Sequence, residues 1–219
     1  MPTLANDALY ARIRAGIFQD EYAWQEKARI PFRAKRPAEG LHLLLYRCPK
    51  CGAEFTTRTQ DCEIFCTACG NRGIMDAYGF LSSKGADAVI PPSPLAWVDL
   101  QCAALQEEMR APDYRLTARC CLQYHLNEHA LDHVDVGEGI VTLDRSGISY
   151  EGTAEGAPLA FHYPLSDFYK LPFAPGRRFE LPPAPRVTAI RTLEPAAIWK
   201  FVLALPLLQQ ATRKAPENI

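Results

Sequence analysis

Two short cysteine motifs are the parts of this chain best suited to chemistry. Cys48-Pro49-Lys50-Cys51-Gly52 and Cys66-Thr67-Ala68-Cys69-Gly70 are each a Cys-x-x-Cys pair followed by glycine, and fourteen residues separate Cys51 from Cys66. Thiolates in two such pairs can surround one Zn²⁺ tetrahedrally. Glycine adopts positive φ without steric cost, so each motif can turn back on its own sulfurs. The spacing predicts one zinc ion bound by Cys48, Cys51, Cys66 and Cys69.

The segment between the motifs predicts a hairpin that returns the second motif to the first. Its expected strands are 53–58 and 62–65, with the turn at 59–61. Cys62 has no ligand spacing to Cys66 and is expected in a strand. Because four protein ligands leave no open coordination position, the zinc is expected to hold structure and not to take part in a reaction.

Three histidines form a second candidate cluster. His125, His129 and His133 recur every four residues. On a helix this spacing aligns the rings on one face, where they could bind a second metal ion with an open position. The alternative is a strand end followed by a polar loop, because an alternating apolar pattern precedes the segment. The metal content distinguishes the two, since one zinc per chain supports the cysteine site alone.

The neighbouring cysteines Cys120 and Cys121 raise the question of redox chemistry. Successive side chains of a strand point to opposite faces. Cys120 is therefore expected in the core, and Cys121 at the surface or half-buried. A disulfide between neighbours would be strained. The chain also contains no recognisable nucleophile turn and no glycine-rich phosphate loop.

Length, charge and apolar content indicate the domain count and argue against a secreted, membrane-spanning or generally nucleic-acid-binding protein. The 219 residues can form one large or two small domains, and the net charge of −1 gives no general attraction to nucleic acid. The stretch 1–19 lacks the apolar core of a signal peptide. The apolar stretch 196–208 is too short to span a bilayer and contains Lys200 and Pro206. Reduced, metal-bound cysteine favours a cytoplasmic protein.

The N-terminal region predicts two helices and a basic segment. One helix begins at Asn6 and carries Leu9, Ile13 and Ile17 on one face, and a second spans about 20–29. The extended, basic stretch that follows could contact lipid headgroups, although such runs are more often solvated linkers. The candidate lipid-binding residues are Lys27, Arg29, Arg33, Lys35 and Arg36.

The remaining pattern predicts an α+β protein. A strand is expected at 41–46, and the stretch 74–81 closes a rubredoxin-like zinc ribbon. Ser93 and Pro94 start a linking helix that runs to about Arg110, with Leu95, Val98, Cys102, Leu105 and Met109 at helical spacing.

From Tyr114 the apolar period changes to two. About seven short strands follow, one of them at 167–171, and a helix at 194–212 ends the pattern. This order predicts an antiparallel β-barrel like that of pleckstrin-homology (PH) or GRAM domains, capped by a C-terminal helix. The expected organisation is a helical lead-in with a basic linker (1–40), a zinc ribbon (41–82), a linking helix (93–112) and a PH/GRAM-like domain (113–213).

Several motifs resemble one known protein region. They include Glu21-Tyr22-Ala23-Trp24-Gln25, Arg36 to Leu41, Leu45 to Cys51, Cys66 to Asn71, Met75 to Gly79, Gly137-Glu138-Gly139, Leu143-Asp144, Tyr150-Glu151-Gly152 and Leu171-Pro172-Phe173. Together they are similar to the region that follows the catalytic domain in bacterial, mainly clostridial, lysophosphatidate (1-acylglycerol-3-phosphate) acyltransferases. The similarity covers most of the chain and is most specific at the cysteine motifs. It implies a zinc ribbon followed by a PH/GRAM-like domain.

The catalytic motifs of that family do not match well. Its His-x-x-x-x-Asp motif has a counterpart in spacing at His162 and Asp167, and Glu151-Gly152-Thr153 is similar to its phosphate-binding loop. In this chain the order of the two motifs is reversed and Pro164 interrupts the first. His162 and Asp167 are more simply surface residues of the barrel. The resemblance therefore implies an accessory region without its acyltransferase domain.

The leading hypothesis is a cytoplasmic, non-catalytic module that assists bacterial phospholipid biosynthesis. Its expected partners are an anionic membrane surface, reached peripherally at the inner face of the membrane, or an acyltransferase domain or protein. One alternative is an acyltransferase in its own right that uses His162 and Asp167. Another is a zinc ribbon that binds nucleic acid, which the near-zero charge and the lack of interleaved aromatic and basic residues disfavour.

Overall fold

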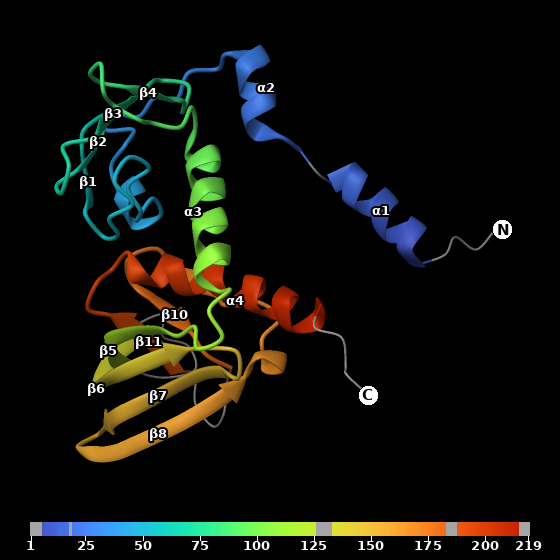
Figure 1. Ribbon diagram of the computed structural model, residues 1–219, viewed down its shortest axis with the longest axis vertical. Coiled ribbons are helices and arrows are strands. Elements are labelled where there is room, and N and C mark those ends of the chain that lie inside the picture. The colour runs from blue at the N-terminus through green and yellow to red at the C-terminus, as the bar shows by residue number, and fades with distance from the viewer. Residues whose placement is uncertain (1–5, 18, 126–132, 183–187, 215–219) are drawn as a thin grey trace.

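Two antiparallel sheets, joined by one long helix, build the protein. The computed structural model describes residues 6–17, 19–125, 133–182 and 188–214 (Figure 1). In Figure 1 the two sheets lie at opposite ends of helix α3 (Pro94–Glu108), so we call residues 19–92 the cysteine-rich half and residues 114–214 the sheet half. The α+β class predicted from the pattern is confirmed.

The cysteine-rich half is built on a small sheet in the order β1-β2-β3-β4, with β1 (Thr57–Gln60), β2 (Glu63–Cys66), β3 (Arg72–Met75) and β4 (Leu81–Ser83). The predicted hairpin is present, but its turn is tighter than expected. Asp61 and Cys62 alone connect Gln60 to its partner Glu63, and Asp61 has φ 54°. Asp tolerates this left-handed conformation. Cys62 therefore lies in the turn, and its expected place in a strand was wrong.

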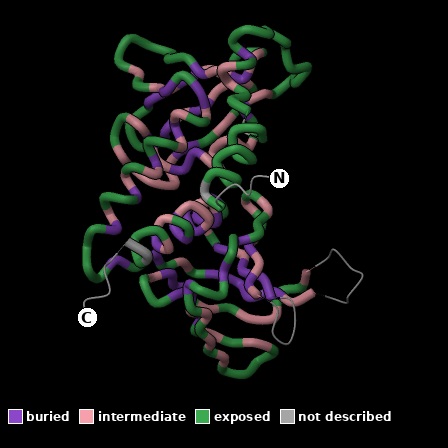
Figure 2. The backbone as a smooth tube through the Cα atoms, turned by 90° about the vertical axis from the view of Figure 1, so that its right-hand side faces the viewer, coloured by how far each residue is buried: buried purple, intermediate pink, exposed green. Residues whose placement is uncertain are grey.

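The stretch 41–46 turns where a strand was expected. Gly40 has φ 85° and its carbonyl accepts from the N–H of Leu43, which starts the short 3₁₀ helix η1 (Leu41–Leu43). The chain then buries Leu45 and Tyr46. Figure 2 shows this buried patch in the upper part of the molecule, separate from the larger one below. Four residues form its centre: Leu45, Ile64, Leu81 and Trp97.

Both N-terminal helices are present. In α2 (Glu21–Ala28) the Asp20 carboxylate accepts from the backbone N–H of Ala23 at 2.9 Å, which caps the helix. The buried amide of Gln25 donates to the carbonyls of Ile30 and Tyr78, at 2.6 and 3.2 Å, and ties α2 to the cysteine-rich half. Helix α1 (Asn6–Ile17) extends away from the body in Figure 1.

Helix α3 starts where predicted, and Leu105 and Met109 of the predicted apolar face are buried, but the buried face is shifted. Ser93 caps it, accepting from the N–H of Ala96 at 3.1 Å. Leu95, expected on the apolar face, is half exposed, whereas Trp97 and Gln101 are almost completely buried. Two hydrogen bonds explain why Trp97 and Gln101 point inward. Trp97 Nε1 donates to the carbonyl of Arg47 at 2.8 Å, and Gln101 Nε2 donates to the carbonyl of Leu44 at 2.9 Å. Backbone groups that would otherwise lack partners thus orient the helix.

The sheet half holds seven antiparallel strands in the order β8-β7-β6-β5-β11-β10-β9. Their bounds are β5 (Leu116–His125), β6 (His133–Leu143), β7 (Gly147–Ala154), β8 (Ala157–Pro164), β9 (Phe173–Ala174), β10 (Arg178–Glu180) and β11 (Thr188–Thr192). Within the described residues the outer strands β8 and β9 do not pair, so the sheet is open. The prediction of a closed barrel was therefore wrong.

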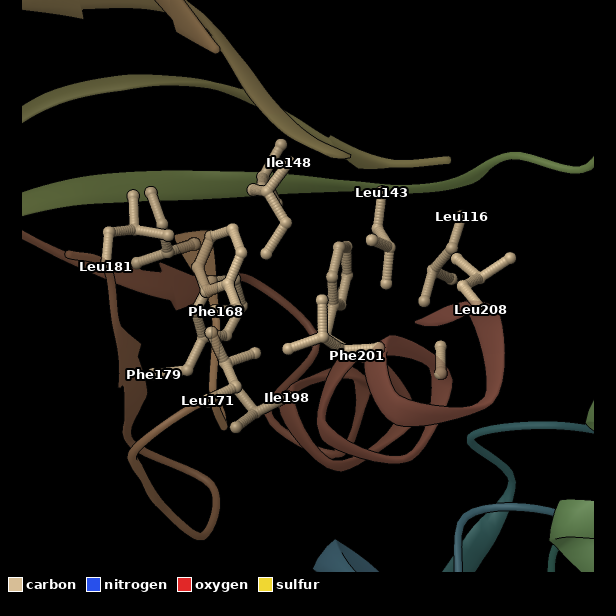
Figure 3. Packing of buried hydrophobic residues seen from close by; sticks show 14 of the residues in the cluster. Leu116, Leu143, Ile148, Phe168, Leu171, Phe179, Leu181, Ile198, Phe201 and Leu208 are labelled. Atoms are coloured by element: carbon tan, nitrogen blue, oxygen red, sulfur yellow. The ribbon is translucent and has the colours of Figure 1, made fainter. Parts of the chain in front are cut away.

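Helix α4 (Ala197–Lys214) explains why the sheet need not close. It lies against the inner face of the sheet, and its residues Ile198, Phe201 and Leu208 meet Leu143, Ile148 and Phe179 in one core (Figure 3). A helix fills the space that the opposite wall of a small barrel would fill. The last two strands at one side of the sheet, β10 and the edge strand β9, are also short.

The predicted strand at 167–171 is absent. The 3₁₀ helix η2 (Leu165–Asp167) stands in its place, and the chain after it directs Phe168 and Leu171 into the core (Figure 3). Phe168 and Leu171 are both buried. The two residues are three positions apart, a spacing that the alternation of a strand does not give. The segment after η2 is therefore irregular and covers one end of the core.

Candidate metal centre

The four motif cysteines lie together, with all four sulfurs within 4.8 Å of one another. Cys48 Sγ lies 3.7 Å from Cys69 Sγ, and Cys51 Sγ lies 3.8 Å from Cys66 Sγ. Four Zn–S bonds of about 2.3 Å in a tetrahedron place neighbouring sulfurs about 3.8 Å apart. A disulfide would need sulfurs about 2.05 Å apart, and all four thiols are free. The geometry could hold a single metal ion among these four sulfurs.

The two motifs are built alike, which explains the glycine after each pair. The N–H of Gly52 donates to the carbonyl of Cys48 at 2.9 Å, and the N–H of Gly70 to that of Cys66 at 3.0 Å. Gly52 and Gly70 have φ of 73° and 72°. Only glycine takes this conformation readily, so both turns depend on it. The first cysteine of each pair is buried and the second is exposed.

Hydrogen bonds favour the thiolate form of one of the four sulfurs, that of Cys66. Burial opposes ionisation of Cys66, but the Thr56 hydroxyl, 3.3 Å away, and the N–H groups of Cys69 and Ala68 outweigh it and lower the pKa of the Cys66 thiol to about 6. Burial raises the pKa of Cys48 to about 12. A bound cation removes such protons, because its charge lowers the pKa of each thiol that it coordinates.

Asn71 links the metal site to the rest of the cysteine-rich half. Its buried amide nitrogen lies 3.8 Å from Cys48 Sγ and donates to the carbonyl of Val89 at 2.8 Å. Its amide oxygen accepts from the N–H of Val89 at 2.8 Å. Sequence reasoning missed this residue. Its place directly after the Cys69-Gly70 turn was the signal that could have identified it.

The histidines do not align on a helix. His125 ends β5 and His133 starts β6, where the two are directly paired across the strands. Their ring centroids lie 4.0 Å apart. His129 lies outside the described residues. The helix-face arrangement of the three histidines was therefore wrong, and the alternative of a strand end is confirmed at His125.

The two residues weighed as catalytic have other partners. His162 lies on β8, and its Nδ1 is 3.0 Å from the Ser149 hydroxyl. Asp167 lies in η2 and accepts from the Ser166 hydroxyl at 3.3 Å. Both residues are exposed, as surface residues of the sheet would be. Within the described residues, no hydrogen bond joins His162 to Asp167.

Cys120 lies in the core as predicted, but Cys121 is buried too, with only 5% of it exposed. Arg191 covers it, with a guanidinium nitrogen 3.1 Å from Cys121 Sγ. Burial raises the pKa of Cys120 to about 12 and raises that of Cys121 as well. Both thiols are therefore protonated near neutral pH and poor nucleophiles.

The predicted lipid-contact residues are all exposed. Within the described part of the chain none of them belongs to an ion pair, and one makes a cation–π contact: the Arg29 guanidinium lies 4.0 Å from the ring centroid of Tyr78. The five are spread over α2 and the segment that follows it: Lys27, Arg29, Arg33, Lys35 and Arg36.

A partly buried charge cluster, with Lys200 as its buried member, joins the two halves, and the sequence did not reveal it. Lys200 of α4 donates to both carboxylate oxygens of Glu54, at 2.9 and 2.8 Å, and lies 3.0 Å from Glu108. Arg47 donates to the same two carboxylates. Burial, reinforced by Glu54 and Glu108, raises the pKa of Tyr46 beside them. The cluster thus connects α4, α3 and the loop between the cysteine motifs.

Two findings concern the chain as a whole. Of the helices in the described residues, none combines the length and the hydropathy needed to cross a bilayer. Compared with models of protein families, with curated proteins and with solved structures, the chain gives no match.

Proposed function

We propose that the protein is a non-catalytic module, held together by one structural zinc ion, that docks peripherally on an anionic membrane surface through its N-terminal segment. The module assists a glycerophospholipid acyltransferase in phosphatidic acid synthesis. The link to acyltransferases rests on the resemblance of the cysteine motifs and their flanking residues. In this proposal the sheet half is a PH/GRAM-like domain, an assignment supported by seven antiparallel strands and one C-terminal helix against their inner face.

The nature of the ligands supports zinc. Four thiolates are soft donors, and a tetrahedral set of four sulfurs is typical of zinc or of iron–sulfur centres. The closed set of four protein ligands leaves no position for substrate, which favours a structural role. Elemental analysis of the purified protein separates zinc from iron.

One observation carries the membrane proposal: the apolar face of α1 is exposed and lies away from the body of the protein (Figure 1). Between 45% and 74% of each of its large apolar side chains is exposed, at Leu9, Tyr10, Ile13 and Ile17. A helix with such a face and basic neighbours, here Arg12 and Arg14, can lie in the interface of a bilayer.

The exposed residues that follow α1 fit the same surface. Trp24, Ile30 and Phe32 are about half exposed and lie in the same part of the chain as the five predicted lipid-contact cations. Aromatic rings sit favourably at the headgroup level of a bilayer. Each Lys or Arg close to an anionic surface contributes about 1 kcal/mol of attraction. The apolar and basic contributions together suit reversible, peripheral binding.

Sedimentation of the full-length protein with lipid vesicles tests the proposal. We expect binding to phosphatidylcholine vesicles that contain phosphatidylglycerol, weaker binding as salt is added, and little binding to phosphatidylcholine alone. Changing the five cations to Glu should abolish binding. Ile13→Ser combined with Ile17→Ser should weaken the binding that remains at high salt, because it removes apolar area from the interface.

The matched control changes the net charge equally but outside the N-terminal segment, after α3 and in the sheet half. It reverses five exposed cations: Arg110, Arg115, Arg119, Lys170 and Arg177. This variant should bind vesicles as the unmodified protein does, or nearly so. The membrane assignment is wrong if the unmodified protein stays in the supernatant, or if the two sets of reversals weaken binding equally.

A further inference from the structure

Three strands of the sheet half bring together a second set of metal-ligand side chains. His125 on β5 is directly paired with His133 on β6. On the other side of β5, β11 pairs with β10, which carries Glu180. One ligand atom from each of these three residues lies within 4.8 Å of the other two. Glu180 is far from both histidines in sequence, and only the strand order makes it their neighbour.

The register explains why all three project to the same side. Glu180 is paired with Ala189, and Ala189 with Gln123. Paired residues share a face of the sheet, and His125, two residues after Gln123, shares it as well. This is the face opposite the core. Ala189 is small, so the Glu180 side chain can reach across β11 toward the imidazoles.

Asp135, two residues after His133, already has other partners. Asp135 accepts hydrogen bonds from Arg191 and, at 2.7 Å, from the amide of Gln123. The Glu180 carboxylate is less engaged, since the Arg178 Nε lies 3.9 Å from its Oε1, beyond hydrogen-bond distance. All three residues of the cluster are half-buried. Partial burial strengthens attraction to a cation and leaves a path for its entry.

We propose that His125, His133 and Glu180 form a second metal site, for a divalent transition-metal ion such as Zn²⁺. Two imidazoles and one carboxylate suit such ions better than Mg²⁺ or Ca²⁺, which take oxygen ligands. Bonds of about 2.0 to 2.2 Å require only small side-chain rotations from the observed spacing. Three protein ligands leave one coordination position open for water or a small ligand, unlike the closed set of four cysteines.

Zinc stoichiometry of the full-length protein tests the site. After equilibration with excess Zn²⁺ and removal of free metal, we expect a second equivalent besides the one bound by the cysteines. His133→Ala and Glu180→Gln should each lose the second equivalent and keep the first. His162→Ala is the matched control, because it removes an exposed imidazole elsewhere in the same sheet, and it should retain both equivalents.

Cobalt distinguishes the two sites by their ligands. With Co²⁺ the first equivalent should give intense thiolate-to-metal absorption, and the second only the weak bands of nitrogen and oxygen ligands. Nitrogen-15 NMR of the unmodified protein serves where a variant does not fold, as the second equivalent of Zn²⁺ should shift the ring nitrogens of His125 and His133 but not those of His162. The site is refuted by a single equivalent in the unmodified protein, by unchanged imidazole resonances, or by a folded variant that keeps the second equivalent.

Discussion

Each sulfur of the metal centre has a defined local role, and Cys66 is the most constrained. It is buried at the end of β2, and its sulfur lies 3.3 Å from the Thr56 hydroxyl and 3.8 Å from Cys51 Sγ. Metal binding contributes about 10 to 16 kcal/mol of folding free energy in small zinc domains. That range exceeds the total stability of many proteins, about 5 to 15 kcal/mol.

Cys66→Ser should therefore abolish stoichiometric zinc binding and unfold the cysteine-rich half, because three remaining ligands bind the ion far less tightly. A strong chelator should lower the melting temperature of the unmodified protein in the same way. Zinc content and thermal unfolding followed by circular dichroism measure both effects.

Cys62→Ser is the control for this substitution. Cys62 lies four residues before Cys66 but sits in the hairpin turn, outside the sulfur cluster. This variant should keep the zinc and its melting temperature. An equal loss of metal in both variants, or a melting temperature that a chelator leaves unchanged, contradicts the assignment of the four ligands.

At the scale of the elements, glycines in β6 and β7 let two strands approach closely. Gly139 is paired with Gly152. A Cβ at Gly139 would lie 2.4 Å from the carbonyl oxygen of Glu151 and 2.8 Å from the ring of Tyr150. The buried Tyr150 ring thus covers the backbone where a side chain is missing.

Gly139→Ala should destabilise the sheet half by about 1 to 3 kcal/mol, the cost of overpacking a tight site, because backbone atoms must move to admit the methyl group. Urea unfolding measures the change. Gly16→Ala is the control, since a Cβ there meets nothing within 4 Å and lies in helix α1, where Ala is favoured. Equal effects of the two substitutions would exclude the steric explanation.

For the whole molecule, Lys200 is the main polar link between the two halves. Only 8% of its side chain is exposed, and it contacts carboxylates from the loop between the cysteine motifs and from α3. Removing one partner of a fully buried ion pair costs about 3 to 5 kcal/mol. Here Glu54 and Glu108 keep 22% and 32% of their side chains exposed, so solvent offsets part of that cost. Arg47 alone would then face both Glu54 and Glu108.

Lys200→Met should therefore lower the free energy of unfolding by about 1 to 3 kcal/mol, the cost of leaving partly buried charged groups without one of their partners. Lys84→Met is the control, because Lys84 also pairs with a glutamate, Glu63, but nearly half of its side chain is exposed. A solvent-exposed pair is worth about 1 kcal/mol or less. Urea unfolding compares the two variants, and a loss at Lys200 no larger than that at Lys84 would show that the cluster does not couple the halves.

Local patterns determined much of this protein before any tertiary contact was known. The cysteine spacing, the caps at Asp20 and Ser93, and the alternation from Leu116 to Leu122 each depend on residues close in sequence, so short-range geometry is enough to predict them. The turns at Gly52 and Gly70 are of the same kind.

Other features depend on residues that only the fold makes neighbours. Lys200 meets Glu54, His125 and His133 meet Glu180, and Gln101 meets the backbone of Leu44. No local pattern encodes which distant partner a polar side chain will find. The open sheet was decided in the same way, because α4 fills the inner face and removes the need for closure. Long-range packing thus overrode local propensity where the two differed.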